Sequence, residues 1–188
     1  MIRNDFEGVP AHAARMTNTL TSATIESLQP VRAGQGDHHF FLNHLATVKV
    51  RAGGSDSGLA LVEFVAPRGF GPPLHMHTEE DELMYVLEGD IRIDLDSGDS
   101  TIVSAGAVVT LPHGIPHVWQ VVSDTARFLT VNAGRRSAPS FDNFVAALGT
   151  PTDPSSLPDP IEIDPGHVAQ VCAAHGIAVL GPPPPPID

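Results

Sequence analysis

The chain has 188 residues, of which 41% are hydrophobic, and a net charge of −12 that results from 22 acidic and 10 basic residues. This length suits one domain with extensions, and the negative charge disfavours nucleic acids and anionic membranes as partners. The single cysteine, Cys172, excludes an intrachain disulfide. The sequence lacks both a bilayer-length apolar stretch and the apolar core of a signal peptide, so the expected location is the cytoplasm.

Residues 1–35 mix Ala, Thr, Pro and Gly without a sustained period. Neither a strand nor a helix is predicted from such a pattern. We expect this segment to be an N-terminal arm that packs on the following domain or on a partner subunit.

From Phe40 onward, short β-rich runs alternate with turns that carry Gly, Pro, Asp or Ser. The predicted strands are Phe40–Val50, Leu59–Ala66, Leu74–His77, Glu82–Leu87, Ile91–Leu95, Thr101–Ser104, Val108–Leu111, His117–Val122 and Ala126–Val131. Strands at this spacing, with no helical period between them, predict an all-β sandwich or barrel over residues 36–136.

Two of these runs indicate how the strands are buried. Apolar and charged residues alternate in Ile91–Asp96, as expected of a strand with one face in the core. The run Leu83–Leu87 is apolar throughout, which predicts that both of its faces are covered.

Residues 137–188 are predicted to form a helical extension with a proline-rich tail. A first helix would begin after Ser140 as N-cap and stop at Gly149, and a second would begin after Asp164 and end near Gly176. We expect the helices to cover one face or mouth of the barrel. The tail GPPPPPID could pack on the barrel as polyproline or be disordered.

Four residues form a candidate metal site. His75 and His77 would project from the same face of a strand because side chains alternate with period two. Glu82 begins the next predicted strand, and His117 opens a later one. Three imidazoles and a carboxylate suit one divalent transition metal per chain, either iron, nickel, manganese, cobalt, copper or zinc.

Histidines beside apolar strands can also be half-buried structural residues, and pairs of this kind arise by chance among 10 histidines. A second group is predicted to be solvated or to cap other elements: His38, His39, His44, His113, His167 and His175. His12 falls in the N-terminal arm.

Period two also predicts which side chains line a pocket. If Glu82 points inward, Met84 and Val86 point inward with it, and His117 carries Trp119 inward. Met84, Trp119 and Phe70 are therefore the candidate pocket residues for a small molecule, although a single buried tryptophan could equally be core.

The residues that frame the four candidate ligands occur at fixed spacing. They are Gly69, Gly89, Gly106, Pro112 and Gly114. Together with the ligands they resemble the paired motifs of the cupin superfamily, except that Val121 stands where that family usually has Asn. The C-terminal pattern is similar to bacterial monocupins related to quercetin 2,3-dioxygenase.

The resemblance implies a jelly-roll β-barrel, or double-stranded β-helix, with short C-terminal helices. It also implies that His75, His77, Glu82 and His117 hold the metal, and that Glu82 takes a proton from an enolic substrate. A metal-dependent dioxygenase acting on an enolic or flavonol-like molecule and O2 follows as the expected function.

Other cupin functions stay open from the sequence. They are isomerase, lyase or decarboxylase chemistry without O2, a small-molecule-binding module without catalysis, and a storage or structural role. We expect a homodimer, because symmetric dimers are the commonest assembly.

Overall fold

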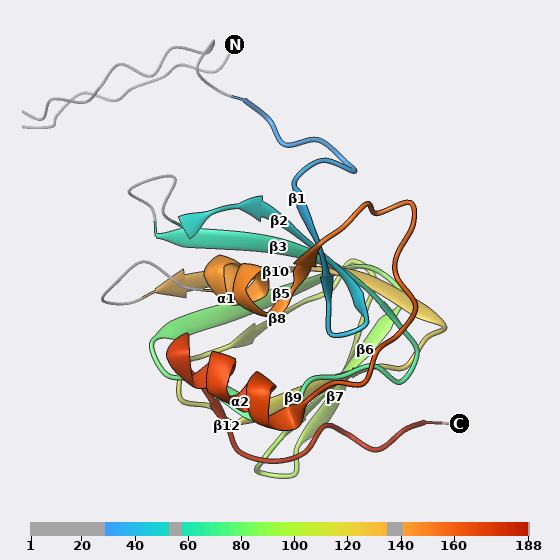
Figure 1. Ribbon diagram of the computed structural model, residues 1–188. Coiled ribbons are helices and arrows are strands. Elements are labelled where there is room, and N and C mark those ends of the chain that lie inside the picture. The colour runs from blue at the N-terminus through green and yellow to red at the C-terminus, as the bar shows by residue number, and fades with distance from the viewer. Residues whose placement is uncertain (1–28, 53–57, 135–140, 188) are drawn as a thin grey trace, which may run out of the picture. The chain divides into compact units, whose positions relative to one another are not determined.

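The computed structural model describes residues 29–52, 58–134 and 141–187 (Figure 1). The chain divides into two compact units, Met1–Pro30 and Val31–Asp188. Residues 1–28 of the predicted N-terminal arm lie outside the described residues, and so does Ser140, the predicted first N-cap. The second unit is considered below.

Most of this unit consists of β-strands. In chain order its elements are β1 (Asp37–Phe41), β2 (His44–Val50), β3 (Leu59–Pro67), β4 (His75–His77), β5 (Glu80–Glu88), β6 (Asp90–Leu95), β7 (Ser100–Ser104), β8 (Val108–Leu111), β9 (His117–Val121), β10 (Thr125–Gly134), α1 (Phe141–Leu148), β11 (Thr150–Pro151), α2 (Pro165–Ala174) and β12 (Ile177–Val179).

The strands form two antiparallel sheets. One has the order β11-β1-β2-β3-β10-β5-β8, and the other has the order β12-β4-β9-β6-β7. Crossovers between distant strands and two facing antiparallel sheets characterise a jelly roll. The predicted all-β jelly-roll fold with short C-terminal helices is therefore confirmed, with the strands shared between two sheets and not closed into one.

Alternating burial along the strands builds the core between the sheets. In β6, Ile91 and Ile93 are buried whereas Arg92 and Asp94 are partly exposed, as predicted. The prediction that both faces of the run Leu83–Leu87 are covered is wrong, because Tyr85 is 39% exposed. An apolar composition did not distinguish this half-buried strand from a fully buried one.

The run Phe40–Val50, predicted as one strand, is a hairpin of β1 and β2. Leu42 and Asn43 both have left-handed backbone angles, with φ of 47° and 68°. Two such residues in succession make the tight turn that joins antiparallel strands. The turn was missed because Leu rarely adopts this conformation.

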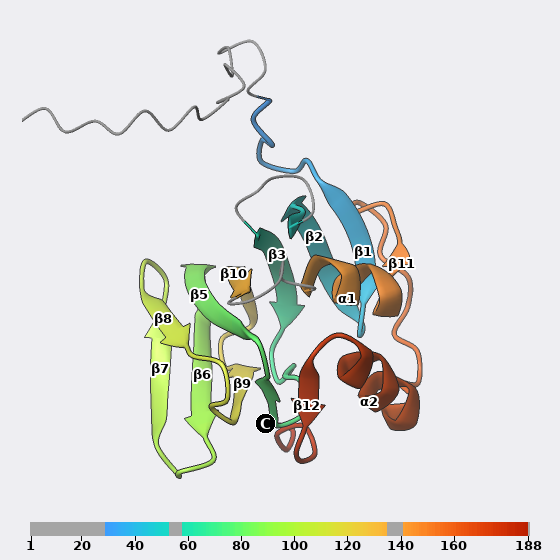
Figure 2. The same ribbon diagram turned by 90° about the vertical axis from the view of Figure 1, so that its left-hand side faces the viewer.

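The C-terminal segment adds to the sheets as well as covering them (Figure 2). Helix α1 ends just before Gly149, as predicted, and buries Phe141, Phe144 and Val145. Asp164 caps α2, also as predicted, by accepting a hydrogen bond from Gly166 N. Unpredicted strand β11 pairs with β1, and β12 pairs with β4.

The polyproline tail packs on the jelly roll, which was one of the two predicted alternatives. The backbone oxygen of Pro182 accepts a hydrogen bond from Leu74 N, and that of Pro185 accepts one from the side chain of Gln120. These contacts lie beside Val121, whose side chain is fully buried and pairs across the sheet with Ile91. An apolar residue therefore fits this position.

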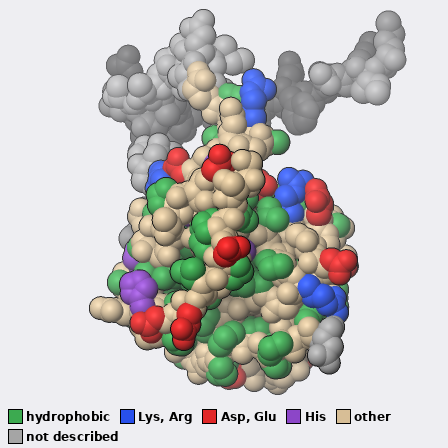
Figure 3. Space-filling model, turned by 45° about the vertical axis from the view of Figure 1, so that its right-hand side comes forward, with side chains coloured by type: hydrophobic (Ala, Val, Ile, Leu, Met, Phe, Trp, Pro, Cys, Tyr) green, Lys and Arg blue, Asp and Glu red, His purple; other side chains and the backbone are tan. Residues whose placement is uncertain are grey.

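One face of the molecule carries both acidic side chains and several groups of hydrophobic ones (Figure 3). Exposed large hydrophobic residues include Leu157, Ile161 and Ile163, which precede α2. Within the described ranges, no helix combines the length and the hydropathy needed to cross a membrane.

Gly89 of the cupin-like motif lies in the turn between β5 and β6, where there is no room for a side chain. A Cβ there would lie 2.3 Å from the Thr125 backbone oxygen, whereas a Cβ on Gly98 meets no atom within 4 Å. Both glycines are left-handed, with φ of 79° and 92°. We expect Gly98→Ala to cost about 1–2 kcal/mol of unfolding free energy from backbone strain alone.

We expect Gly89→Ala to cost about 1–3 kcal/mol more, because the added methyl overlaps backbone atoms. Urea unfolding, followed by the fluorescence of Trp119, measures both variants. Equal destabilisation of the two would contradict the steric argument.

Candidate metal centre

Strand β4 presents two histidines to the interior. His75 and His77 are buried, and Met76 between them is half-buried and faces the other way. The strand pairs with β9 so that His75 lies directly opposite His117. The antiparallel register therefore brings together two histidines that are far apart in the sequence.

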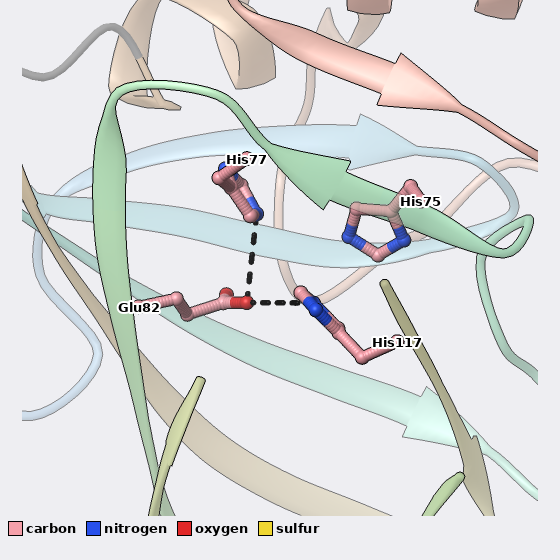
Figure 4. Close-up of side chains that lie close together, drawn as sticks. All are labelled: His75, His77, Glu82 and His117. Atoms are coloured by element: carbon pink, nitrogen blue, oxygen red, sulfur yellow. Dashed lines mark ion pairs between the residues drawn. The ribbon is translucent and has the colours of Figure 1, made fainter. Parts of the chain in front are cut away.

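Glu82 reaches the same point from the opposite sheet. It lies on β5, is 4% exposed, and pairs across the sheet with Asn132 of β10. Figure 4 shows its carboxylate pointing toward the rings of His77 and His117. One ligand atom from each of His75, His77, Glu82 and His117 lies within 4.8 Å of the others, and all four residues are buried.

The spacing of these atoms fits one metal ion. Glu82 Oε2 lies 3.5 Å from His77 Nε2 and 3.5 Å from His117 Nε2. Two ligands at about 2.1 Å from one ion would be about 3.0 Å apart at a right angle and about 3.4 Å apart at a tetrahedral angle. Little movement would be needed for these atoms to close on a cation.

Hydrogen bonds orient two of the rings for metal binding. His75 Nδ1 donates to the Pro73 backbone oxygen at 2.8 Å, and His117 Nδ1 donates to the Ile115 backbone oxygen at 2.9 Å. A carbonyl only accepts, so each proton is on Nδ1 and each Nε2 keeps a lone pair. Backbone partners of this kind typically hold metal-binding histidines.

The inner atoms of the cluster have no hydrogen-bond partner among the described residues. They are His77 Nε2, Glu82 Oε2 and His117 Nε2, all fully buried. Unpaired buried polar atoms are rare because each is costly. Converging lone pairs and a carboxylate would be satisfied together by one cation, so the cluster is consistent with a single metal site in which His75, His77, Glu82 and His117 are the ligands.

The cluster shifts the protonation of its own members. Burial, followed by the charges of His117 and His77, lowers the pKa of His75 to about 3. Burial alone would raise the pKa of Glu82. The favourable interactions of its carboxylate with His117 and His77 outweigh this effect and hold the pKa below its usual range. Neutral His75 and ionised Glu82 are the forms that bind metals.

An apolar cavity of about 50 Å³ opens beside this cluster. His75 and Glu82 contribute to its wall, and so do the predicted pocket residues Phe70 and Trp119. Met84 is fully buried, as expected from its phase with Glu82, but it lies in the core and does not line this cavity.

The C-terminal segment closes part of the cavity, which the sequence did not reveal. This segment contributes the lining residues Phe141, Phe144, Val168, Cys172, Ile177 and Val179. Burial raises the pKa of the Cys172 thiol to about 11, so this cysteine is an apolar wall residue and not a nucleophile. Helix α2 and strand β12 thus belong to the site.

A wider hollow of about 370 Å³ adjoins the cavity. The two share the wall residues Leu42, Phe70, Pro72, Pro73, Val168 and Val179. The two spaces therefore lie next to each other, along the same wall residues.

Several histidines outside the cluster were predicted to be solvated or to cap other elements. His175 does cap α2, and His167 is exposed. The prediction is wrong for His39 and His44, which are 6% and 2% exposed. The alternation of His44 with the apolar residues Ala46 and Val48 indicates its burial, although not that it lines the cavity.

A sequence model of the cupin domain matches residues 61–132, the segment that contains all four members of the cluster. This chain contains a cupin domain. The match begins in β3 and ends in β10, so it covers the strands that supply His75, His77, Glu82 and His117.

One curated relative is distant in sequence. The quercetin 2,3-dioxygenase of Bacillus subtilis (strain 168) is 25% identical over 128 residues, which are 68% of this chain and 36% of that enzyme. The chain thus spans about a third of the length of this curated relative.

Among solved structures, the polyketide cyclase RemF from Streptomyces resistomycificus is 26% identical, with a TM-score of 0.49 over 56% of this chain and 78% of its own. The DMSP lyase DddQ from Ruegeria pomeroyi DSS-3 is 24% identical, with a TM-score of 0.44 over 50% of this chain and 48% of its own.

Removal of one ligand tests the metal site. His77→Ala should reduce bound transition metal from near one ion per chain to a trace, because only three ligands would remain. Plasma mass spectrometry of protein purified in the same way measures this content. His167→Ala, which removes an exposed histidine of α2, should retain the wild-type content. Equal trace metal in all three proteins, after reconstitution, would rule out the site.

Buried His44 predicts a pH dependence of stability. Burial lowers its pKa from 6.5 to about 4, against the opposing effect of the Leu42 carbonyl. The unfolded chain therefore binds more protons between these values, so stability is full above about pH 6.5 and falls toward pH 4, by at most about 1.4 kcal/mol per pH unit.

His44→Phe should remove this contribution. Between pH 7 and pH 5, metal-free wild type should lose about 2 kcal/mol more unfolding free energy than metal-free His44→Phe. Urea titrations at both pH values measure the difference, and identical losses in the two proteins would contradict the burial of a neutral imidazole.

Proposed function

We propose that this cupin is a metal-dependent dioxygenase of the quercetinase-like type, acting on an enolic small molecule. The observation that carries the proposal is the buried cluster of three histidines and one glutamate at the end of an apolar cavity. The similarity of the chain to a quercetin 2,3-dioxygenase supports the reaction class. A homodimer and a cytoplasmic location stay predictions.

Glu82 is the proposed catalytic base. Its carboxylate faces the cavity, and its lowered pKa keeps it ionised at neutral pH. A divalent transition metal, when bound, would lower the pKa of a hydroxyl group that coordinates it. A carboxylate of low basicity would then suffice to accept the proton of an enol.

The cavity walls would exclude water and orient a flat ring. Phe70 and Trp119 lie with ring centroids 5.5 Å apart and both line the cavity. A space of about 50 Å³ accommodates only the reacting end of a substrate, so the remainder would lie in the adjoining hollow. Prolines 72 and 73 stiffen the shared wall.

The proposed reaction needs no external reductant. An electron-rich enolate supplies the electrons that reduce O2, and both oxygen atoms enter the products. A carbon–carbon bond of the substrate breaks as new carbon–oxygen bonds form.

Oxygen uptake tests this function. Protein reconstituted separately with iron, nickel, manganese, cobalt, copper or zinc should consume O2 with quercetin as the probe. Glu82→Gln should lower the rate per bound metal at least about 100-fold, because the amide cannot accept the proton. Glu88→Gln makes the same change at the exposed end of β5 and should retain full activity.

Two outcomes would contradict the proposal in different ways. Turnover of the probe without O2 would place the protein among cupins that catalyse isomerisation, elimination or decarboxylation. Tight binding of the probe to metal-loaded protein, without turnover by any metal form, would indicate a binding module.

A further inference from the structure

His44 stands out in an otherwise apolar part of the cavity wall. It begins β2, is 2% exposed, and its ring centroid lies 4.0 Å from that of Phe70. The rings of Phe41 and Phe64 are each 5.4 Å away. It lies outside the four-residue cluster, so metal binding does not account for it.

The hydrogen bond of His44 determines which nitrogen carries the proton. Nδ1 lies 3.2 Å from the Leu42 backbone oxygen, which can only accept. His75 and His117 make the same bond to the carbonyl two residues earlier, and His117 Nε2 lies 3.5 Å from Glu82 Oε2. Burial lowers the pKa of His44 to about 4, so the ring is neutral at pH 7, with its proton on Nδ1 and its lone pair on Nε2.

This lone pair has no donor among the described residues. His44 Nε2 is fully buried and lacks a hydrogen-bond partner, although the ring lines the same cavity as His75 and Glu82. A buried acceptor without a donor is costly, and native proteins usually provide a partner. A hydrogen-bond donor on a bound molecule would satisfy it.

We propose that His44 Nε2 accepts a hydrogen bond from a hydroxyl or N–H group of the substrate, at a point separate from the metal-binding end. The inference rests on the proposed function only in taking this cavity as the substrate site. It defines the substrate class as a largely apolar enol that carries a second, donating polar group. A molecule without that group would leave Nε2 unpaired and bind more weakly.

Matched pairs of ligands test this assignment. Kojic acid and allomaltol are enolic hydroxyketones that differ in one hydroxyl group, and quercetin and 3-hydroxyflavone form a longer pair. Dissociation constants are measured with zinc-loaded protein under anaerobic conditions, where the absence of O2 prevents oxygenation of the ligands. Wild type should prefer the more hydroxylated member of at least one pair.

His44→Phe keeps a ring of similar size but removes the acceptor. We expect the preference to fall about tenfold in this variant, through weaker binding of the hydroxylated member alone. His39→Phe is the matched control, since it makes the same change at a buried histidine outside the cavity wall. An unchanged preference for both pairs in His44→Phe would overturn the inference.

A second measurement needs no variant. Nitrogen NMR of zinc-loaded wild type should show His44 with its proton on Nδ1 and an unprotonated Nε2 at pH 7. The Nε2 resonance should move on addition of the hydroxylated probe and not on addition of its partner. A proton on Nε2, or no change with any probe, would contradict the assignment.

The two proposals fail separately. A His44-dependent preference without oxygen uptake would remove the dioxygenase and retain the donor-binding role of His44. Oxygen uptake with no effect of His44→Phe on either pair would do the reverse.

Discussion

The antiparallel pairing of β4 with β9 is the constraint on which the site depends. It sets His75 opposite His117, and period two then turns His77 toward the same side. Glu82 faces them from the other sheet. Since a one-residue slip would turn every side chain of β4 to the opposite face, the core around these strands also maintains the cluster.

The same packing strengthens electrostatic interactions within the cluster. Its polar atoms are buried beside phenylalanine and tryptophan rings, where charges interact more strongly than in water. Such a cluster costs folding free energy, because His77 Nε2, Glu82 Oε2 and His117 Nε2 have no hydrogen-bond partner among the described residues. Binding of a cation would convert this cost into affinity.

Segments at both ends of the jelly roll shape what can reach the cluster. The β1–β2 hairpin supplies His44, whereas α1, α2 and β12 supply six of the other wall residues. Strand β12 pairs directly with β4, so Ile177 lies beside His77 and Val179 beside His75. The C-terminal segment therefore couples the ligand strand to the cavity, and differences in this segment would alter specificity without changing the ligands.

Local patterns were enough to predict much of this molecule. Alternation and turn residues predicted an all-β sandwich or barrel, and the resemblance to the cupin motifs implied the jelly roll. The spacing of His75, His77, Glu82 and His117 identified the residues that converge. The alternation, the turns and the segment from His75 to Glu82 are encoded within a few residues, because period two and tight turns are local properties of the backbone. His117 lies far along the chain and was joined to them by the resemblance to the cupin motifs.

Folding alone decided the rest. The β1–β2 turn uses a left-handed Leu42, the partners of β11 and β12 lie more than 90 residues away, and Met84 and Trp119 share an inward phase but not a cavity. His44 gained its place beside the cluster in the same way. Such contacts depend on which strands become neighbours, and no local spacing contains that information.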